Sequence, residues 1–105
     1  MIAGREAKPI ATSSMRPILW PADTQLKVIS ICLRDLRLDR DLTQKQVGAA
    51  IGMSGQWVSA VENGYRTLAI NVEHLLLLLK LYGVSLIEFT QMVDRSMRDF
   101  VRRDS

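Results

Sequence analysis

The fold is decided by residues 42–64, which read LTQKQVGAAIGMSGQWVSAVENG. Thr43 is a residue type that caps helix N-termini, and Gln46 follows at the three-residue spacing of a capping box. Gly52 predicts the end of this helix, because glycine tolerates the left-handed backbone of a C-cap. Ser54 then caps a second helix, which ends at the final Asn-Gly pair. The stretch therefore predicts two short helices joined by three residues.

Helical periodicity extends upstream of this stretch. Apolar residues recur there at steps of three and four residues, and they predict a helix that begins at Asp23 or Thr24 and ends within residues 38–40. Cys32 lies beside the apolar stripe, and we expect it to be a small packed side chain and not a reactive thiol. The inward stripe comprises Leu26, Ile29, Leu33 and Leu36.

Two further helices are predicted downstream. Asn71 can cap a helix over residues 72–82, and this helix is apolar on most sides, so we expect it to be buried all round. A capping box at residues 85–88 opens a fifth helix. The fifth helix carries a long apolar stripe. This stripe can pack back on the same chain, but its length favours packing on a partner chain, because little of a five-helix core is left for it to cover. It comprises Leu86, Phe89, Val93, Met97 and Phe100.

The composition excludes several classes of function. The chain has 105 residues, one cysteine and one histidine, so it is one domain in size and can form neither an internal disulfide nor a Cys/His zinc cluster. It carries no carboxylate pair, nucleophile with base or phosphate-binding glycine loop, and we expect no enzyme activity, metal or cofactor. The longest aliphatic run, 75–79, is far shorter than the roughly 18 residues of a membrane span. We therefore expect a cytoplasmic protein with no membrane partner.

Charge and prolines divide the chain into three parts. Residues 1–22 hold all three prolines and a net charge of +2, and we expect a flexible or extended arm there. This arm contains the apolar group Ile18-Leu19-Trp20. We expect Trp20 to cap the domain core, and a dimer contact, made by a short strand, is the alternative. Residues 23–90 form the domain and are neutral overall, so nucleic-acid binding needs a locally basic face. Residues 91–105 form a helical extension that we expect to contribute to dimerisation.

The two short helices and their glycine-containing turn have the form of a helix-turn-helix. Residues 33–88 resemble the DNA-binding domains of the phage repressor and Cro family, also called the XRE family. The resemblance implies an all-α, five-helix, lambda-repressor-like domain, to which this chain adds an extended C-terminal helix. The residues that carry it are Arg37, Leu42-Thr43-Gln44, Val47-Gly48, Ile51-Gly52-Met53-Ser54, Val58-Ser59, Val61-Glu62-Asn63-Gly64 and Leu81-Tyr82-Gly83-Val84-Ser85.

The resemblance also implies which residues touch DNA. Gln56 is the best direct reader, since its amide can form two hydrogen bonds to adenine. Gln44 can bond a phosphate and also brace Gln56, whereas Trp57 either contacts DNA or covers the edge of the core. Some of the implied base contacts follow from the face of the third helix that points away from the core. The full set is Gln44, Gly55, Gln56, Trp57, Ser59 and Ala60. The implied phosphate contacts are Lys45, Ser54, Asn63, Tyr65 and Arg66.

Two features of this domain concern its architecture. Arg37 and Glu62 match a family pair that forms a buried or half-buried salt bridge between the first and third helices. Gly48 faces the other helix of the motif at a position where the family prefers alanine. Glycine keeps the close approach but costs about 1 kcal/mol of helix propensity.

The direct readout is thin, because Gly55 and Ala60 offer base edges no side-chain hydrogen bond and residues 55–62 contain no Lys or Arg. Specificity then depends on Gln56, Trp57 and DNA shape, or the domain binds a protein instead. We expect a dimeric, sequence-specific transcriptional regulator, a repressor, that inserts the helix around 55–62 into the major groove. Its dimerisation residues would be Phe89, Val93, Met97 and Phe100. The alternative is an antitoxin that binds a toxin and autoregulates its operon, since residues 23–86 more loosely resemble HipB-type antitoxins.

Overall fold

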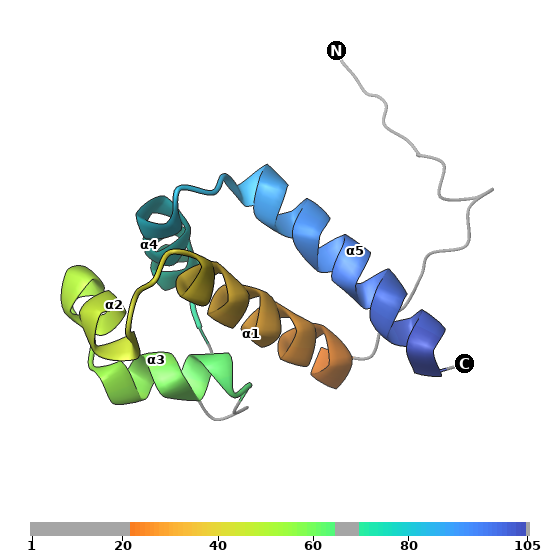
Figure 1. The fold of residues 1–105 in the computed structure, drawn as a ribbon, viewed down its shortest axis with the longest axis horizontal. Helices are drawn as coiled ribbons and strands as arrows, with labels where there is room; N and C mark the ends of the chain where they lie inside the picture. Colours follow the sequence, from red (N-terminus) through yellow and green to blue (C-terminus); the bar gives the residue numbers. More distant parts are fainter. Residues whose placement is uncertain (1–21, 65–69, 105) are drawn as a thin grey trace, which may run out of the picture.

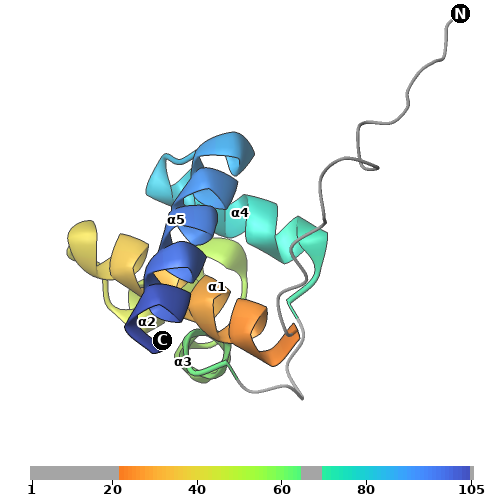
Figure 2. The same ribbon diagram turned by 90° about the vertical axis from the view of Figure 1, so that its right-hand side faces the viewer.

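Five helices follow one another in the computed structural model, which describes residues 22–64 and 70–104. They are α1 (Ala22–Asp39), α2 (Gln44–Ile51), α3 (Gly55–Glu62), α4 (Val72–Tyr82) and α5 (Leu86–Asp104). No strand occurs in the described ranges. The central helix α1 lies between α3 on one side and α5 on the other (Figure 1, Figure 2). The predicted all-α, five-helix class is confirmed.

The helix boundaries follow the predicted caps. The Thr43 hydroxyl accepts a hydrogen bond from the backbone N–H of Gln46 at 3.0 Å, and the Gln46 side chain accepts one from the N–H of Thr43 at 2.8 Å. Gly52 ends α2 with φ +76°, a left-handed conformation that costs glycine little. Ser85 and Glu88 form a second reciprocal capping box before α5. Local sequence therefore fixes where these helices begin and end.

The core gathers side chains from all five helices. Its largest fully buried members are Leu33, Leu78, Leu79, Met97, Val47 and Val58. Cys32 is 2% exposed and lies within hydrogen-bond distance of the Ser96 hydroxyl, and burial raises the pKa of its thiol. The prediction of a packed, unreactive cysteine is consistent with this position, because the thiolate form is disfavoured.

Two predictions of burial are wrong. Leu26 is 43% exposed, because the buried residues of α1 begin only at Val28. Helix α4 is not buried all round: it packs on α2 and α5, which leaves its outer side open. The exposed leucines of α4 are Leu76, Leu77 and Leu81, at 46%, 38% and 37%. No single described helix is both long and apolar enough to span a membrane, and α4 with α5 meets that test only as a pair bent by 95°.

The apolar stripe of α5 packs on its own chain. Phe89 and Met97 are 2% and 1% exposed, and Val93 and Phe100 are partly buried. The expectation that this stripe faces a partner is therefore wrong for Phe89 and Met97, which belong to the core. The physical reason is that α5 runs along α1 and covers it, so the apolar stripe is used within the monomer. Among the α5 side chains that the structure describes, the large exposed apolar ones lie in the first turn, at Leu86 and Ile87.

Candidate nucleic-acid interface

Helix α3 has one buried face and one face of small polar or apolar side chains. Val58 and Val61 are 2% and 6% exposed and fix α3 on the core. Gln56 is exposed, while Ser59 and Ala60 are half-buried. The helix spans Gly55–Glu62, about two turns, and its N-cap Ser54 accepts a hydrogen bond from the backbone N–H of Trp57 at 3.0 Å. Gln56 thus has the longest polar side chain on the outer face of α3.

Helix α2 packs closely on the turn before α3 and on the first residue of α3, which leaves no room for a side chain at Gly48 and little room at Gly55. A Cβ added at Gly48 would lie 2.7 Å from the backbone oxygens of Met53 and Ser54. A Cβ at Gly55 would lie 3.2 Å from the Cα of Lys45, so position 55 faces α2 and does not point straight outward. These contacts fix the angle at which α3 is presented. The sequence predicted the close approach at Gly48 but not the one at Gly55.

A buried polar network holds α3 to α1. The Arg37 guanidinium donates two hydrogen bonds to the Glu62 carboxylate, at 2.7 and 3.0 Å, and a third to the backbone oxygen of Leu42 at 2.7 Å. Arg37 and Glu62 are only 8% and 5% exposed, and the hydrogen bond that Arg37 donates to Glu62 raises the pKa of Arg37. The bridge implied by the family resemblance is therefore present, and both its carboxylate oxygens have partners.

Gln44 has a different partner from the expected ones. Its side-chain amide donates to the Glu62 carboxylate at 3.2 Å and so extends the buried network to the start of α2. Expectation placed this amide against a phosphate and against Gln56. In the free protein Gln44 links α2 to α3, and its contacts with a phosphate and with Gln56 in a DNA complex stay predictions.

Two other predicted contact residues bind each other. The Asn63 side-chain amide donates to the backbone oxygen of Ser59 at 2.7 Å and to its hydroxyl at 3.2 Å. Lys45 is exposed on the first turn of α2. Tyr65 and Arg66 lie outside the described residues.

Trp57 and His74 form a contact that sequence reasoning missed. Their ring centroids are 5.1 Å apart with an interplanar angle of 61°, an edge-to-face arrangement typical of aromatic pairs. Trp57 is partly buried against the core, which supports the structural alternative while leaving part of the indole accessible. No periodic signal links a lone histidine to a tryptophan seventeen positions away. The pair joins α3 to the first turn of α4.

Tyr82 is a second buried group that the sequence did not single out. It is 2% exposed, and burial, followed by the nearby Glu62 charge, raises its pKa to about 12. Its backbone oxygen accepts a hydrogen bond from Arg40 at 2.8 Å. Tyr82 therefore ties the end of α4 to the end of α1.

Comparison with known proteins gives a consistent answer. A model of the helix-turn-helix family matches residues 33–89. Two crystal structures of single-residue mutants of the restriction-modification controller protein C.Esp1396I are similar to this chain in fold. Each has a TM-score of 0.63 and 21% sequence identity, and the match covers 70% of this chain and 96% of that one. No curated protein matches.

Proposed function

The chain belongs to the helix-turn-helix family of DNA-binding regulators, and we propose that it inserts α3 into the major groove of duplex DNA to recognise sequence. The observation that supports this most directly is the division of α3 into a buried face, with Val58 and Val61, and an open face with Gln56. A helix fixed on its core at one side can enter a groove about 12 Å wide at the other.

Gln56 is the proposed base-reading residue. Its amide N–H can donate to N7 of adenine while its amide oxygen accepts from the exocyclic N6 amine, and a good bidentate pair of this kind gives about 1–3 kcal/mol of discrimination. Ala60 and the accessible part of Trp57 are proposed to contact thymine methyl groups. Ser59 is proposed to contact a base edge either as a hydrogen-bond donor or as an acceptor. Because these contacts are few, DNA shape is proposed to supply the remaining specificity.

Phosphate contacts are proposed to set the register. Lys45 supports this role, since it is exposed at the N-terminus of α2, where backbone N–H groups also favour anions. Tyr65 and Arg66 are proposed as further phosphate contacts from their positions in the motif alone. Ser54 and Asn63 hold their present partners through hydroxyl and amide groups that retain further hydrogen-bonding capacity.

A twofold dimer is proposed, because one short helix with one good polar contact gives little affinity. Two copies of α3 would meet half-sites about 34 Å apart. The support is an exposed apolar surface on α4 and the start of α5, which replaces the α5 stripe as the candidate interface. We call it the α4–α5 patch, and it comprises Leu77, Leu81, Leu86 and Ile87. Repression is proposed as the outcome, since occupancy of a promoter needs no further surface.

Gel-shift titrations at two salt concentrations test the assigned roles. We expect Gln56→Ala to lower the preference for the recognised duplex about tenfold while changing non-specific binding little. Lys45→Ala should weaken binding to every duplex and lower the slope of log affinity against log salt by about 1. Arg98→Ala is the matched control, because it removes one positive charge from an exposed pair with Asp94 on α5. Equal, sequence-blind losses for Gln56→Ala and Lys45→Ala would overturn the assignment.

A further inference from the structure

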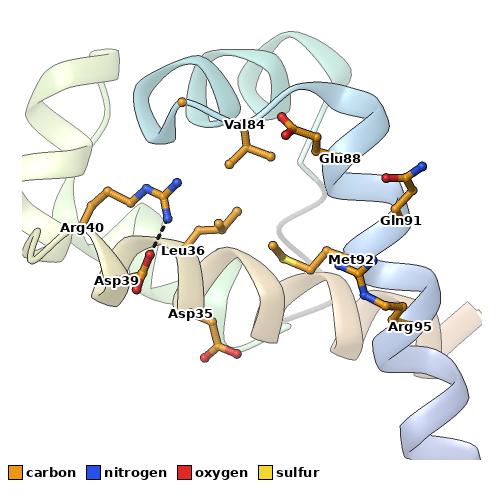
Figure 3. Close-up of a pocket in the computed structure, with 10 residues that line it drawn as sticks. Asp35, Leu36, Asp39, Arg40, Val84, Glu88, Gln91, Met92 and Arg95 are labelled. Atoms are coloured by element: carbon orange, nitrogen blue, oxygen red, sulfur yellow. Dashed lines mark hydrogen bonds and ion pairs between the residues drawn. The ribbon is translucent and has the colours of Figure 1, made fainter.

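A groove between α1 and α5 plays no part in the proposed DNA contacts. It consists of two cavities, of about 550 and 210 Å³, which share Asp35 in their walls. In the larger one, Leu36, Val84 and Met92 point into the space between the helices, and Glu88, Gln91 and Arg95 lie along the α5 side (Figure 3). The smaller one is lined by Val28, Ile31, Asp35, Ser96, Asp99 and Phe100.

The two cavities follow one face of the helix pair. Their lining residues recur at steps of three and four residues along each helix, which is the spacing of a single helical face. On α1 these are Val28, Ile31, Asp35 and Asp39, and on α5 they are Glu88, Met92, Arg95 and Asp99. The two cavities adjoin at Asp35, and together they extend from near residue 28 of α1 to the α4–α5 turn; we refer to them as the groove.

The groove has an apolar floor, and its rim carries four carboxylates and two arginines, namely Asp35, Asp39, Glu88 and Asp99 with Arg40 and Arg95. Ile31, Met92 and Phe100 are only partly buried, so apolar surface faces the groove without cover from the described residues. Asp35 is exposed and forms no ion pair with any side chain that the structure describes. Arg40, by contrast, is already engaged by Asp39 and by the backbone oxygen of Tyr82. An occupant with apolar side chains and one positive charge near Asp35 fits this lining.

We propose that residues 15–20 of the same chain, which read MRPILW, occupy the groove. Ile18, Leu19 and Trp20 cover its apolar floor, and Arg16 lies beside Asp35. The segment has the required chemistry, with one cation next to three large apolar side chains. Pro17 and Pro21 favour an extended backbone at and just before each proline, and each proline has no N–H group to leave unsatisfied on an apolar floor.

The lengths also match. The segment joins α1 at its first residue, Ala22, and must fold back along α1 to enter the groove. The helical rise places Ile31 about 14 Å and Asp35 about 20 Å along the axis from Ala22. Reversing direction takes about two residues, 20 and 21, and an extended chain then rises about 3.3 Å per residue, so the Cα of Ile18 lies about 7 Å and that of Arg16 about 13 Å along the axis from Ala22. The apolar side chains thus meet the end of the groove near residue 28, and the long Arg16 side chain spans the remaining distance to Asp35.

Tryptophan fluorescence of the full-length chain tests this docking. In a Trp57→Phe background Trp20 is the sole tryptophan, and we expect a blue-shifted emission maximum and slow quenching by acrylamide. Asp35→Arg should shift the emission to the red and accelerate quenching several-fold. Combining Asp35→Arg with Arg16→Asp should restore the original values, because the pair is then reversed. Glu73→Arg, an equal charge change on the exposed first turn of α4, should leave both readings unchanged.

Three outcomes would overturn the docking. These are quenching of Trp20 as fast as that of free tryptophan, a reversed pair that does not restore protection, and protection that falls on dilution, which would place the segment on a second copy. If the Trp57→Phe chain does not fold, nuclear Overhauser contacts in the unmodified chain decide between the alternatives. We expect them between the Trp20 or Ile18 side chains and Ile31 or Phe100, and their absence contradicts the proposal. Neither measurement uses DNA, so its result is independent of the proposed function.

Discussion

Arg37 and Glu62 show how a single buried pair can set the direction of a helix. The Glu62 carboxylate receives hydrogen bonds from Arg37 and Gln44, which lie on α1 and α2, while Glu62 itself ends α3. Three helices therefore meet at one carboxylate. Sequence resemblance predicted the ion pair, but not the part of Gln44, because an amide's choice between a phosphate and a buried carboxylate depends on tertiary distances.

Removing one member of this pair should be costly. We expect Glu62→Ala to lower the free energy of unfolding by about 3–5 kcal/mol, because it leaves the Arg37 charge buried without its partner. Replacing both Arg37 and Glu62 with methionine should cost less than Glu62→Ala, since no buried charge then remains. Urea denaturation followed by circular dichroism measures both values. A double variant less stable than Glu62→Ala would mean that the pair itself supplies the stability.

Tyr82 should make the domain sensitive to alkali. Its pKa is about 12 in the folded protein and 10.0 for an unperturbed tyrosine, so folding favours the neutral phenol. The resulting contribution to stability is fully present below pH 10 and is lost as the pH rises towards 12, and it amounts to about 3 kcal/mol.

The matched comparison is Tyr82→Phe, which has no phenol to ionise. The difference in unfolding free energy between the parent and Tyr82→Phe should be constant below pH 10 and should shift against the parent between pH 10 and 12. Urea denaturation at a series of pH values provides the curve. A difference that stays flat over this range would show that Tyr82 ionises as freely in the folded chain as in the unfolded one.

At the scale of elements, boundaries were predictable and faces were not. The ends of α2 and α4 depend on local groups, namely the caps Thr43, Gly52, Asn71 and Gly83, so short stretches of sequence suffice to locate them. Which side of α4 or α5 is buried depends on where other helices lie. Apolar composition alone therefore predicted too much burial for α4. It also predicted that the apolar stripe of α5 packs on a partner chain, whereas this stripe packs on α1 of the same chain.

The approach of α2 to the turn before α3 gives a test at this scale. Gly48→Ala would gain about 1 kcal/mol of helix propensity, but the new Cβ would lie 2.7 Å from backbone atoms that no side-chain rotation can move. Overpacking of this kind typically costs 1–3 kcal/mol, so we expect net destabilisation. Ala49→Gly on the exposed side of α2 is the control, with a loss of about 1 kcal/mol from propensity alone. A higher midpoint of thermal unfolding for Gly48→Ala than for the parent chain would contradict the close contact between Gly48 and the turn before α3.

At the scale of the whole molecule, the fold could be predicted more completely than the interface. The order of five helices followed from caps and periodicity, whereas the contacts of Gln44, Trp57 and Gly55 required the assembled structure. The sequence predicted dimerisation through the α5 stripe, but Phe89 and Met97 of that stripe lie in the core. The exposed α4–α5 patch is therefore the candidate dimer surface.

The α4–α5 patch makes a prediction about assembly. We expect Leu81→Asp to convert a dimer to a monomer in sedimentation analysis, because a buried, unpaired carboxylate would oppose association. Leu38→Asp is the control, since Leu38 is an exposed leucine of α1 outside the patch, at 53%. A parent chain that is monomeric at micromolar concentration, or a dimer that survives Leu81→Asp, would exclude this surface as the interface.

The central claim is that the open face of α3 reads base edges, and selection from a random duplex library by the purified full-length chain tests it most directly. The account predicts a palindromic consensus with half-sites one helical turn apart, and loss of preference at one base pair of each half-site for Gln56→Ala. A consensus that Gln56→Ala leaves unchanged, or no enrichment of any sequence by the parent chain, would contradict it.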